Sequence, residues 1–193
     1  MADSNITKRA LASALKELME TMPFEKITIS HICDKCCMNR KSFYYHFKDK
    51  YDLVNWIYDT EFVAVVCHMK DDDPWVLFSM LCRYLYDNRR FYRKALQIRG
   101  QNSFYDHFHE TLVPITGKAL QYAVPDTSVK TVSETGQAFA KEFTSNFITD
   151  GIIAALERWL LGKNDINADD FLFLVRSITE KLAARVYDRH SNE

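Results

Sequence analysis

The sequence predicts an all-α protein in which a three-helix domain precedes a larger helical bundle. Hydrophobic residues make up 47% of the 193 residues, and only five glycines and four prolines are present, so an ordered chain is expected. Apolar residues also recur at intervals of three and four, the spacing that gathers them on one face of a helix. We expect a first domain at 1–52 and a second at 53–193.

Charge and cysteine content narrow the class of protein. The formal net charge is −1, but residues 1–52 hold nine Lys or Arg against seven Asp or Glu, which weakly favours a nucleic-acid contact there. Five cysteines without a signal-peptide pattern predict a reducing, cytoplasmic location. No apolar run approaches the roughly 18 residues that a membrane span needs, so no membrane partner is expected.

The first helix is expected from Ile6 to Met22. Its apolar residues step by three and four and would cover the helices that follow; they are Ile6, Ala10, Leu11, Ala14, Leu15, Leu18 and Met22. Pro23 ends this helix. Lys8 and Arg9, near its start, suit either an approach to DNA or an ordinary solvated face.

Two short helices separated by a tight turn are expected next. Thr28 is suited to cap the first of them. Its inward residues are Ile29, Ile32, Cys33 and Cys36. This helix is too short to be stable alone, so it must pack on its neighbours. Asn39 is suited to cap the second, and Phe43 and Phe47, four residues apart, would anchor it.

The outward face of the second short helix combines basic, aromatic and hydroxyl groups. They belong to Arg40, Lys41, Ser42, Tyr44, Tyr45 and His46. Guanidinium and ammonium groups suit base edges and phosphates, and phenols and hydroxyls donate to phosphate oxygens. Asp49 is suited to cap a third helix, where a phosphate would satisfy Lys50 and nearby backbone N–H groups. The pattern indicates a helix-turn-helix that reads double-stranded DNA.

The second domain begins with a long linking helix that is expected to continue to about residue 69. The three aspartates at 71–73 would cap the following helix, with Pro74 in its first turn, because acidic residues and proline both suit a helix N-terminus. These aspartates could in principle bind a metal, but adjacent side chains diverge. A solvated capping run is the better interpretation.

Four more helices are expected in the second domain. Asn88 is placed to cap a short basic helix, and a helix from Ser103 to about Tyr122 is bent by Pro114. A loop at 124–132 and a long helix at 133–161 follow. Asn167 caps the last helix, with an acidic capping-box partner three residues later.

The stretch from Ile27 to Leu53 resembles the DNA-binding domain of the TetR family of bacterial transcription regulators. That domain has a Thr-capped helix, a turn, a Phe-Tyr-x-His/Tyr-Phe run, and then Lys and Asp-Leu. The matching residues are Thr28, Phe43, Tyr44, His46, Phe47, Lys50, Asp52 and Leu53. One departure is Cys37, where the family usually has glycine; a left-handed backbone there would cost roughly 1 kcal/mol or more.

The resemblance implies a role for each residue near the turn. Those expected to bind phosphate are Thr28, Tyr44, His46 and Lys50. Those expected to face the groove are Arg40, Lys41, Ser42 and Tyr45, and Asn39 is counted with the DNA-binding residues. The protein expected is a sequence-specific transcriptional regulator that binds a DNA operator.

The second domain is similar, in helix order and in the segment from Phe143 to Trp159, to the C-terminal domain of TetR-type regulators of Firmicutes, including regulators of dihydroxyacetone kinase operons. The resemblance implies that the last two helices pair with their copies in a homodimer. The alternative is that they only complete the core of one chain. The resemblance leaves the effector open among a small molecule, a protein partner and zinc.

Aromatic residues are dense between Trp56 and Tyr122, where they would line an effector pocket or fill a core. Those assigned to the pocket are Trp56, Tyr84, Tyr92 and Tyr105. Their mixture of apolar surface and hydroxyl groups favours a small, partly apolar effector.

No cofactor, metal site or catalytic site is expected. Cys33 and Cys36 suggest zinc or redox chemistry, but they share the inward face, where cysteine acts as a small hydrophobe. His107 and His109 point to nearly opposite sides of a helix, although one of them could join Cys67, His68 or Cys82 around a metal. No Gly-rich phosphate loop, nucleophile elbow or triad spacing is present, which argues against an enzyme.

Overall fold

The computed structural model describes residues 2–68, 73–100, 103–123, 134–162 and 166–190, and every regular element within them is helical, as predicted. The chain forms two compact units. Unit 1 combines Met1–Met69 with Asn88–Phe108, and unit 2 combines Lys70–Asp87 with His109–Glu193. The loop expected at 124–132 and two of the three capping aspartates lie outside the described residues. No described helix is both long and apolar enough to cross a membrane.

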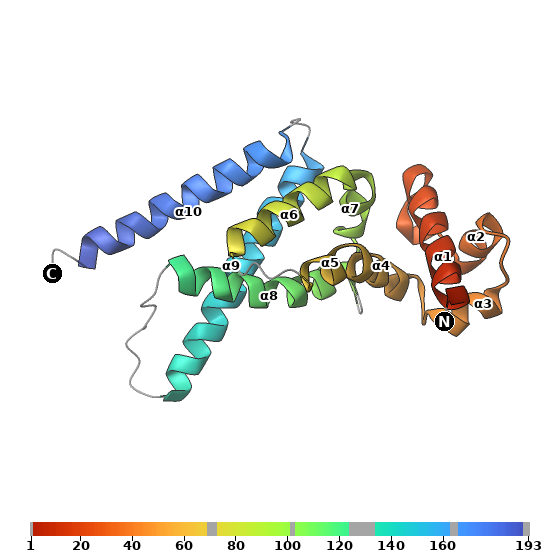
Figure 1. The fold of residues 1–193 in the computed structure, drawn as a ribbon, viewed down its shortest axis with the longest axis horizontal. Helices are drawn as coiled ribbons and strands as arrows, with labels where there is room; N and C mark the ends of the chain where they lie inside the picture. Colours follow the sequence, from red (N-terminus) through yellow and green to blue (C-terminus); the bar gives the residue numbers. More distant parts are fainter. Residues whose placement is uncertain (1, 69–72, 101–102, 124–133, 163–165, 191–193) are drawn as a thin grey trace. The chain divides into compact units, whose positions relative to one another are not determined.

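Unit 1 begins with the predicted three-helix arrangement. Its helices are α1 (Ala2–Thr21), α2 (Ile29–Lys35) and α3 (Arg40–His46), followed by α4 (Lys50–Tyr58). In Figure 1, α2 and α3 lie against α1, and all of α2, α3 and α4 contact it. The core between them is apolar and fully buried, and it includes Leu11, Leu15, Met19, Ile32, Phe43 and Leu53. Burial of these side chains holds together helices that are too short to form alone.

Each short helix of unit 1 starts at the cap that the sequence predicts. Thr28 accepts a hydrogen bond from the backbone N–H of His31, Asn39 from that of Ser42, and Asp49 from those of Tyr51 and Asp52. The ring of His31 also accepts from the N–H of Thr28, which completes a capping box. Side-chain acceptors at these positions satisfy N–H groups that the helix leaves free.

The turn between α2 and α3 is a Schellman motif. The N–H of Met38 donates to the carbonyl of Cys33 at 2.9 Å, and the N–H of Cys37 donates to that of Asp34 at 3.3 Å. Cys37 has a φ of 55°, the left-handed conformation expected for it, and it is the single non-glycine residue with a positive φ among those described. These two bonds set the direction in which the chain leaves α2.

The linking helix differs from the regular helix expected. After α4 it passes through a π-helical segment, η2 (Asp59–Val63), before α5 (Ala64–Val66). Tyr58 is fully buried at this point and meets the rings of Phe62, Tyr92, Phe104 and Phe108 with centroids between 5.4 and 6.4 Å. A wider π turn is a local distortion of the backbone that periodicity does not reveal.

The short basic helix α7 (Arg89–Ala95) packs on α1 within unit 1. The ammonium of Lys94 donates to the backbone carbonyls of Met19 and Met22, at the C-terminal end of α1. A cation is favourable there because the last carbonyls of a helix are free and carry partial negative charge. Lys94 therefore ties α7 to the end of the first helix.

Unit 2 is built from α6 (Pro74–Asp87), most of α8 (Phe104–Ala123), α9 (Glu134–Leu161) and α10 (Ala168–His190). Asp73 caps α6, and Asn167 with Asp170 forms the capping box of α10 that the sequence predicts. Along α10, contacts with α6 are extensive, and the two helices are seen side by side in Figure 1. The rings of Trp159 and Phe171 stack at 4.3 Å and join α9 to α10.

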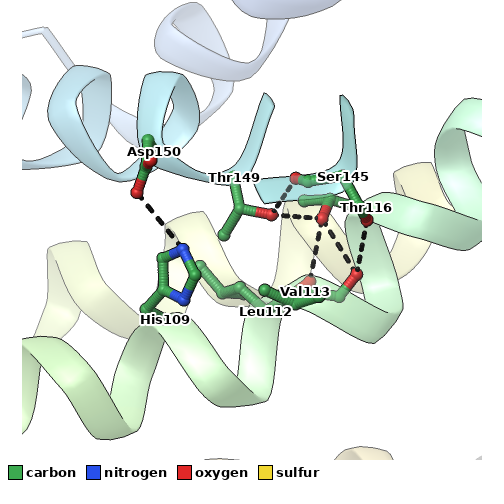
Figure 2. A network of polar contacts seen from close by, with 7 residues as sticks. All are labelled: His109, Leu112, Val113, Thr116, Ser145, Thr149 and Asp150. Carbon is green, nitrogen blue, oxygen red and sulfur yellow. Dashed lines mark hydrogen bonds and ion pairs between the residues drawn. The ribbon is translucent and has the colours of Figure 1, made fainter. Parts of the chain in front are cut away.

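A buried polar seam joins α8 to α9 (Figure 2). The hydroxyl oxygens of Thr116 and Thr149 lie 2.5 Å apart, and Thr149 is fully buried. The Thr149 hydroxyl also reaches the carbonyl of Ser145 at 2.8 Å, and the Ser145 hydroxyl reaches that of Val113 at 3.4 Å. Gly117 leaves room for this approach, because an added Cβ would lie 3.1 Å from the Ser145 hydroxyl oxygen. The seam satisfies its own polar groups inside the helix pair.

Candidate nucleic-acid interface

Helix α3 presents its polar side chains outward because its apolar side is fixed in the core. Phe43 is fully buried and Phe47 is 3% exposed, and their rings lie 5.8 Å apart. The carboxamide oxygen of Asn39 binds both the N–H and the hydroxyl of Ser42, at 2.8 and 3.2 Å. The start and the inward side of the helix are therefore both constrained.

The opposite side of α3 is open to solvent. Tyr45 is 83% exposed and Tyr44 is 51% exposed, which is unusual for large aromatic side chains in a folded domain. Arg40 and Lys41 are also exposed, while His46 is half-buried. The arrangement matches the outward face expected from the sequence: two cations and two phenols on one exposed short helix.

Neighbouring rings and cations on α3 restrain one another. The guanidinium carbon of Arg40 lies 6.0 Å from the centre of the Tyr44 ring, one helical turn away. The rings of Tyr45 and His46 meet edge to face at 4.8 Å. Such contacts limit the rotamers of long side chains before a partner arrives, which lowers the entropy lost on binding.

Thr28 is exposed, and its oxygen already accepts the N–H of His31 at 3.2 Å. A hydroxyl has one hydrogen to donate besides its lone pairs, so the capping bond leaves that hydrogen available for a phosphate oxygen. Thr28 can therefore cap α2 and bind phosphate at once. That phosphate contact stays a prediction.

Lys50 lies in a setting different from the one expected. Its ammonium donates to the carbonyls of Phe24 at 2.8 Å and Ile27 at 2.9 Å, with that of Glu25 at 3.4 Å, around the short 3-10 turn η1 (Phe24–Lys26). The N–H groups of Tyr51 and Asp52, expected to help bind phosphate, bond to the Asp49 carboxylate instead.

Burial lowers the pKa of the Lys50 ammonium, and the nearby Glu25 carboxylate opposes that shift. An ammonium has three donors, and here three backbone carbonyls are in reach of them. A phosphate contact by Lys50 stays a prediction that requires some of these bonds to be exchanged.

The four aromatic residues assigned to an effector pocket are not brought together. Trp56 packs on Phe47 in unit 1, with centroids 5.6 Å apart, and Tyr105 lies 4.2 Å from the guanidinium of Arg99. Tyr92 is fully buried in the aromatic core around Tyr58, so it fills space there, and Tyr84 belongs to unit 2. Aromatic density alone does not distinguish a filled core from a cavity.

Unit 2 holds a cavity of about 190 Å³ that sequence reasoning missed. It lies among α6, α8, α9 and α10, and Trp75, Phe78 and Thr116 are among its lining residues. The apolar spacing of Trp75 and Phe78 was visible in the sequence. It did not show that the helices opposite leave a space unfilled.

The histidines and cysteines considered as metal ligands have other neighbours. The imidazole of His107 lies 2.7 Å from the carboxylate of Asp59, and that of His109 lies 3.2 Å from the carboxylate of Asp150. Cys33 and Cys82 are buried, as expected for the inward face in the case of Cys33. Within the part of the chain that the structure describes, no three His, Cys, Asp or Glu side chains are placed to hold a metal ion.

Two protein-family models match this chain. Residues 11–57 match the model described as bacterial regulatory proteins, tetR family, and residues 73–181 match the one described as transcriptional regulator C-terminal region. The two matches cover the helix-turn-helix of unit 1 and most of the helices of unit 2.

A curated relative points in the same direction. The HTH-type dhaKLM operon transcriptional activator DhaS of Lactococcus lactis subsp. lactis (strain IL1403) is 30% identical over 109 residues, which are 56% of this chain and 57% of the relative. The match thus spans little more than half the length of that relative.

Two solved structures share the fold. The dihydroxyacetone kinase operon activator DhaS has a TM-score of 0.62 at 21% identity, over 93% of this chain and 97% of that one. A Clostridium perfringens putative fatty acid metabolism regulator has a TM-score of 0.56 at 16% identity, over 88% and 94%. At these identities the likeness concerns the arrangement of helices alone.

Proposed function

Because the chain belongs to the TetR family of bacterial transcription regulators, we propose that it binds its operator as a homodimer and that an effector acting on unit 2 controls this binding. The observation that carries the proposal is the exposed face of α3. Tyr44, Tyr45, Arg40 and Lys41 stand in solvent on a helix whose other side is locked in the core. A short helix held in this way can enter the major groove.

Base reading and backbone contact are divided among the exposed residues. Arg40, Lys41, Ser42 and Tyr45 are proposed to face base edges, since a guanidinium or ammonium matches the acceptors of guanine. The proposed phosphate contacts are made by Thr28, Asn39, Tyr44, His46 and Lys50. Phosphate contacts fix the position of the helix on any duplex, whereas base contacts select a sequence.

A homodimer is supported by apolar side chains that one chain leaves uncovered. On α9, Phe139, Phe143 and Phe147 are 69%, 59% and 69% exposed, and each ring stacks on the next with centroids 6.1 Å apart. On α10, Phe173 and Ile178 are 70% and 58% exposed. Large exposed apolar surfaces of this kind mark interaction sites, and a second copy would cover them symmetrically.

The proposal is tested by selecting bound fragments from random duplexes with the purified full-length chain. We expect a sequence with two related half-sites whose centres are roughly 34–36 Å apart, or a multiple of that distance, because two copies of α3 would read one face of the duplex. Recovery of no preferred sequence, with no affinity for duplexes in dilute buffer, would overturn the proposal.

Variants then assign the contacts. Arg40→Ala and Lys41→Ala should each weaken operator binding by about 1–3 kcal/mol and relax the preference at one base position. Tyr44→Phe removes only a hydroxyl and should weaken binding to operator and unrelated duplex equally. Arg158→Ala, which removes an exposed cation from unit 2, is the matched control and should change neither.

A further inference from the structure

The cavity of unit 2 is walled by four helices. Trp75 and Phe78 come from α6, Ile115 and Thr116 from α8, Ile152 from α9 and Val175 from α10, with Ala119 on the α8 side. Its volume of about 190 Å³ is far larger than the space one water molecule occupies. All four walls belong to the same compact unit.

The lining residues carry no charged side chain. A charged ligand would leave water without meeting an opposite charge on the lining, which is strongly unfavourable. The cavity therefore selects for an uncharged ligand.

The few polar groups of the lining are already satisfied. Thr179 donates to the carbonyl of Val175 at 2.8 Å within α10. Thr116 belongs to the seam between α8 and α9, where it meets the Thr149 hydroxyl at 2.5 Å and the carbonyls of Leu112 and Val113 at 3.2 and 3.1 Å (Figure 2). No lining hydroxyl therefore needs a water or a polar ligand group, and an apolar cavity of this kind favours an apolar occupant.

We propose that this cavity is the effector site and that it takes a small, uncharged, largely apolar molecule, about the size of a single aromatic ring with a short substituent. The inference rests on the proposed control of DNA binding by an effector, and it adds the place and the ligand class. Trp75 and Phe78 offer ring surfaces for stacking, and Ile115 and Ile152 offer aliphatic surface.

The cavity also adjoins the uncovered face of α10. Val175 and Thr179 line it, and the preceding residues, Leu174 and Ile178, are 47% and 58% exposed. One side of α10 therefore meets the cavity and the neighbouring side is proposed to meet a second copy. A ligand that fixes α10 against α8 and α9 would change the free energy of dimerisation, and dimerisation would change ligand affinity by the same factor.

The test uses toluene as the probe and benzoate as its charged counterpart, each titrated calorimetrically into the full-length protein. Saturable toluene binding with one site per chain, and no benzoate binding, is the expected result. Ala119→Leu fills the cavity and should weaken toluene binding at least about tenfold, a factor equal to about 1.4 kcal/mol. Ala138→Leu, at an exposed site on α9, is the matched control and should leave toluene binding unchanged.

Circular dichroism and DNA binding separate the possible failures. If Ala119→Leu does not fold, Ile152→Phe fills the same cavity from α9 and replaces it. Absence of saturable toluene binding, equal binding of benzoate, or undiminished toluene binding in the filled variant would each overturn the inference. In those cases intact operator binding by the parent chain would leave the proposed function standing, whereas loss of operator preference would overturn the proposed function instead.

Discussion

The ammonium nitrogen of Lys50 lies 2.8 Å from the carbonyl oxygen of Phe24 and 4.3 Å from the centre of the Phe24 ring. Lys50 is the first residue of α4, and Phe24 begins the turn that precedes α2. The contact therefore joins two parts of the helix-turn-helix domain that are distant in sequence. It makes this cation part of the fold, in addition to any role at the DNA.

Lys50→Met keeps the aliphatic stem and removes the donors. We expect the free energy of unfolding to fall by about 1–3 kcal/mol, because partly buried carbonyls lose their partner. Urea denaturation measures this, with Lys48→Met at an exposed neighbouring position as a control that should change little. If stability were unchanged and the slope of log affinity against log salt fell by about one, Lys50 would act through phosphate instead.

Asn39→Ala should remove the cap of α3 and lower the free energy of unfolding by about 1 kcal/mol. Asn39→Ser retains a side-chain oxygen and should restore most of that loss. Thermal unfolding measures the stability of both variants, and operator titration measures their affinity. Full operator affinity in Asn39→Ser would restrict Asn39 to capping, whereas a loss at full stability would indicate a direct DNA contact.

Phe143→Glu places a charge in the middle of the stacked phenylalanines of α9. If this face joins two copies, burial of the carboxylate should weaken dimerisation by several kcal/mol and shift the protein to monomer at micromolar concentration. Sedimentation equilibrium measures the change, and Ala138→Glu, also exposed on α9, serves as the control. A parent chain that sediments as a stable monomer would contradict the proposed interface.

Thiol reactivity should follow burial. Cys37 and Cys67 are exposed, whereas burial raises the pKa of the Cys82 thiol to about 12. At pH 8 only about one in 10⁴ of the Cys82 side chains would be thiolate, the reactive form. Brief treatment with N-ethylmaleimide should therefore modify two residues in the native protein and all five after denaturation, as counted by mass spectrometry. Rapid native labelling at Cys82 would show that α6 opens readily.

Local signals in the sequence predicted the helix-turn-helix well. Thr28, Asn39 and Asp49 cap their helices through bonds to residues two or three positions away, so the sequence contains both partners of each bond. The alternation of Phe43 and Phe47 with exposed residues likewise placed the outward face of α3. The assignment of individual DNA contacts goes further than these local signals and stays a prediction.

Contacts between distant residues were not predictable in the same way. Lys94 meets carbonyls of α1, and Lys50 meets those of η1, because tertiary packing brings the elements together. Tyr92 was assigned to a pocket but fills a core, while Phe78 lines a cavity. Both are aromatic residues on helices, and only the packing of neighbouring helices distinguishes their roles.

The turn before α3 is shaped by the main chain, since Met38 and Cys37 both bond back to carbonyls of α2. The angle at which the reading helix would enter a groove is then inherited from peptide geometry and owes little to the exposed thiol of Cys37. Mutational drift at residue 37 would consequently alter how firmly the domain holds together sooner than it would alter which operator the domain recognises.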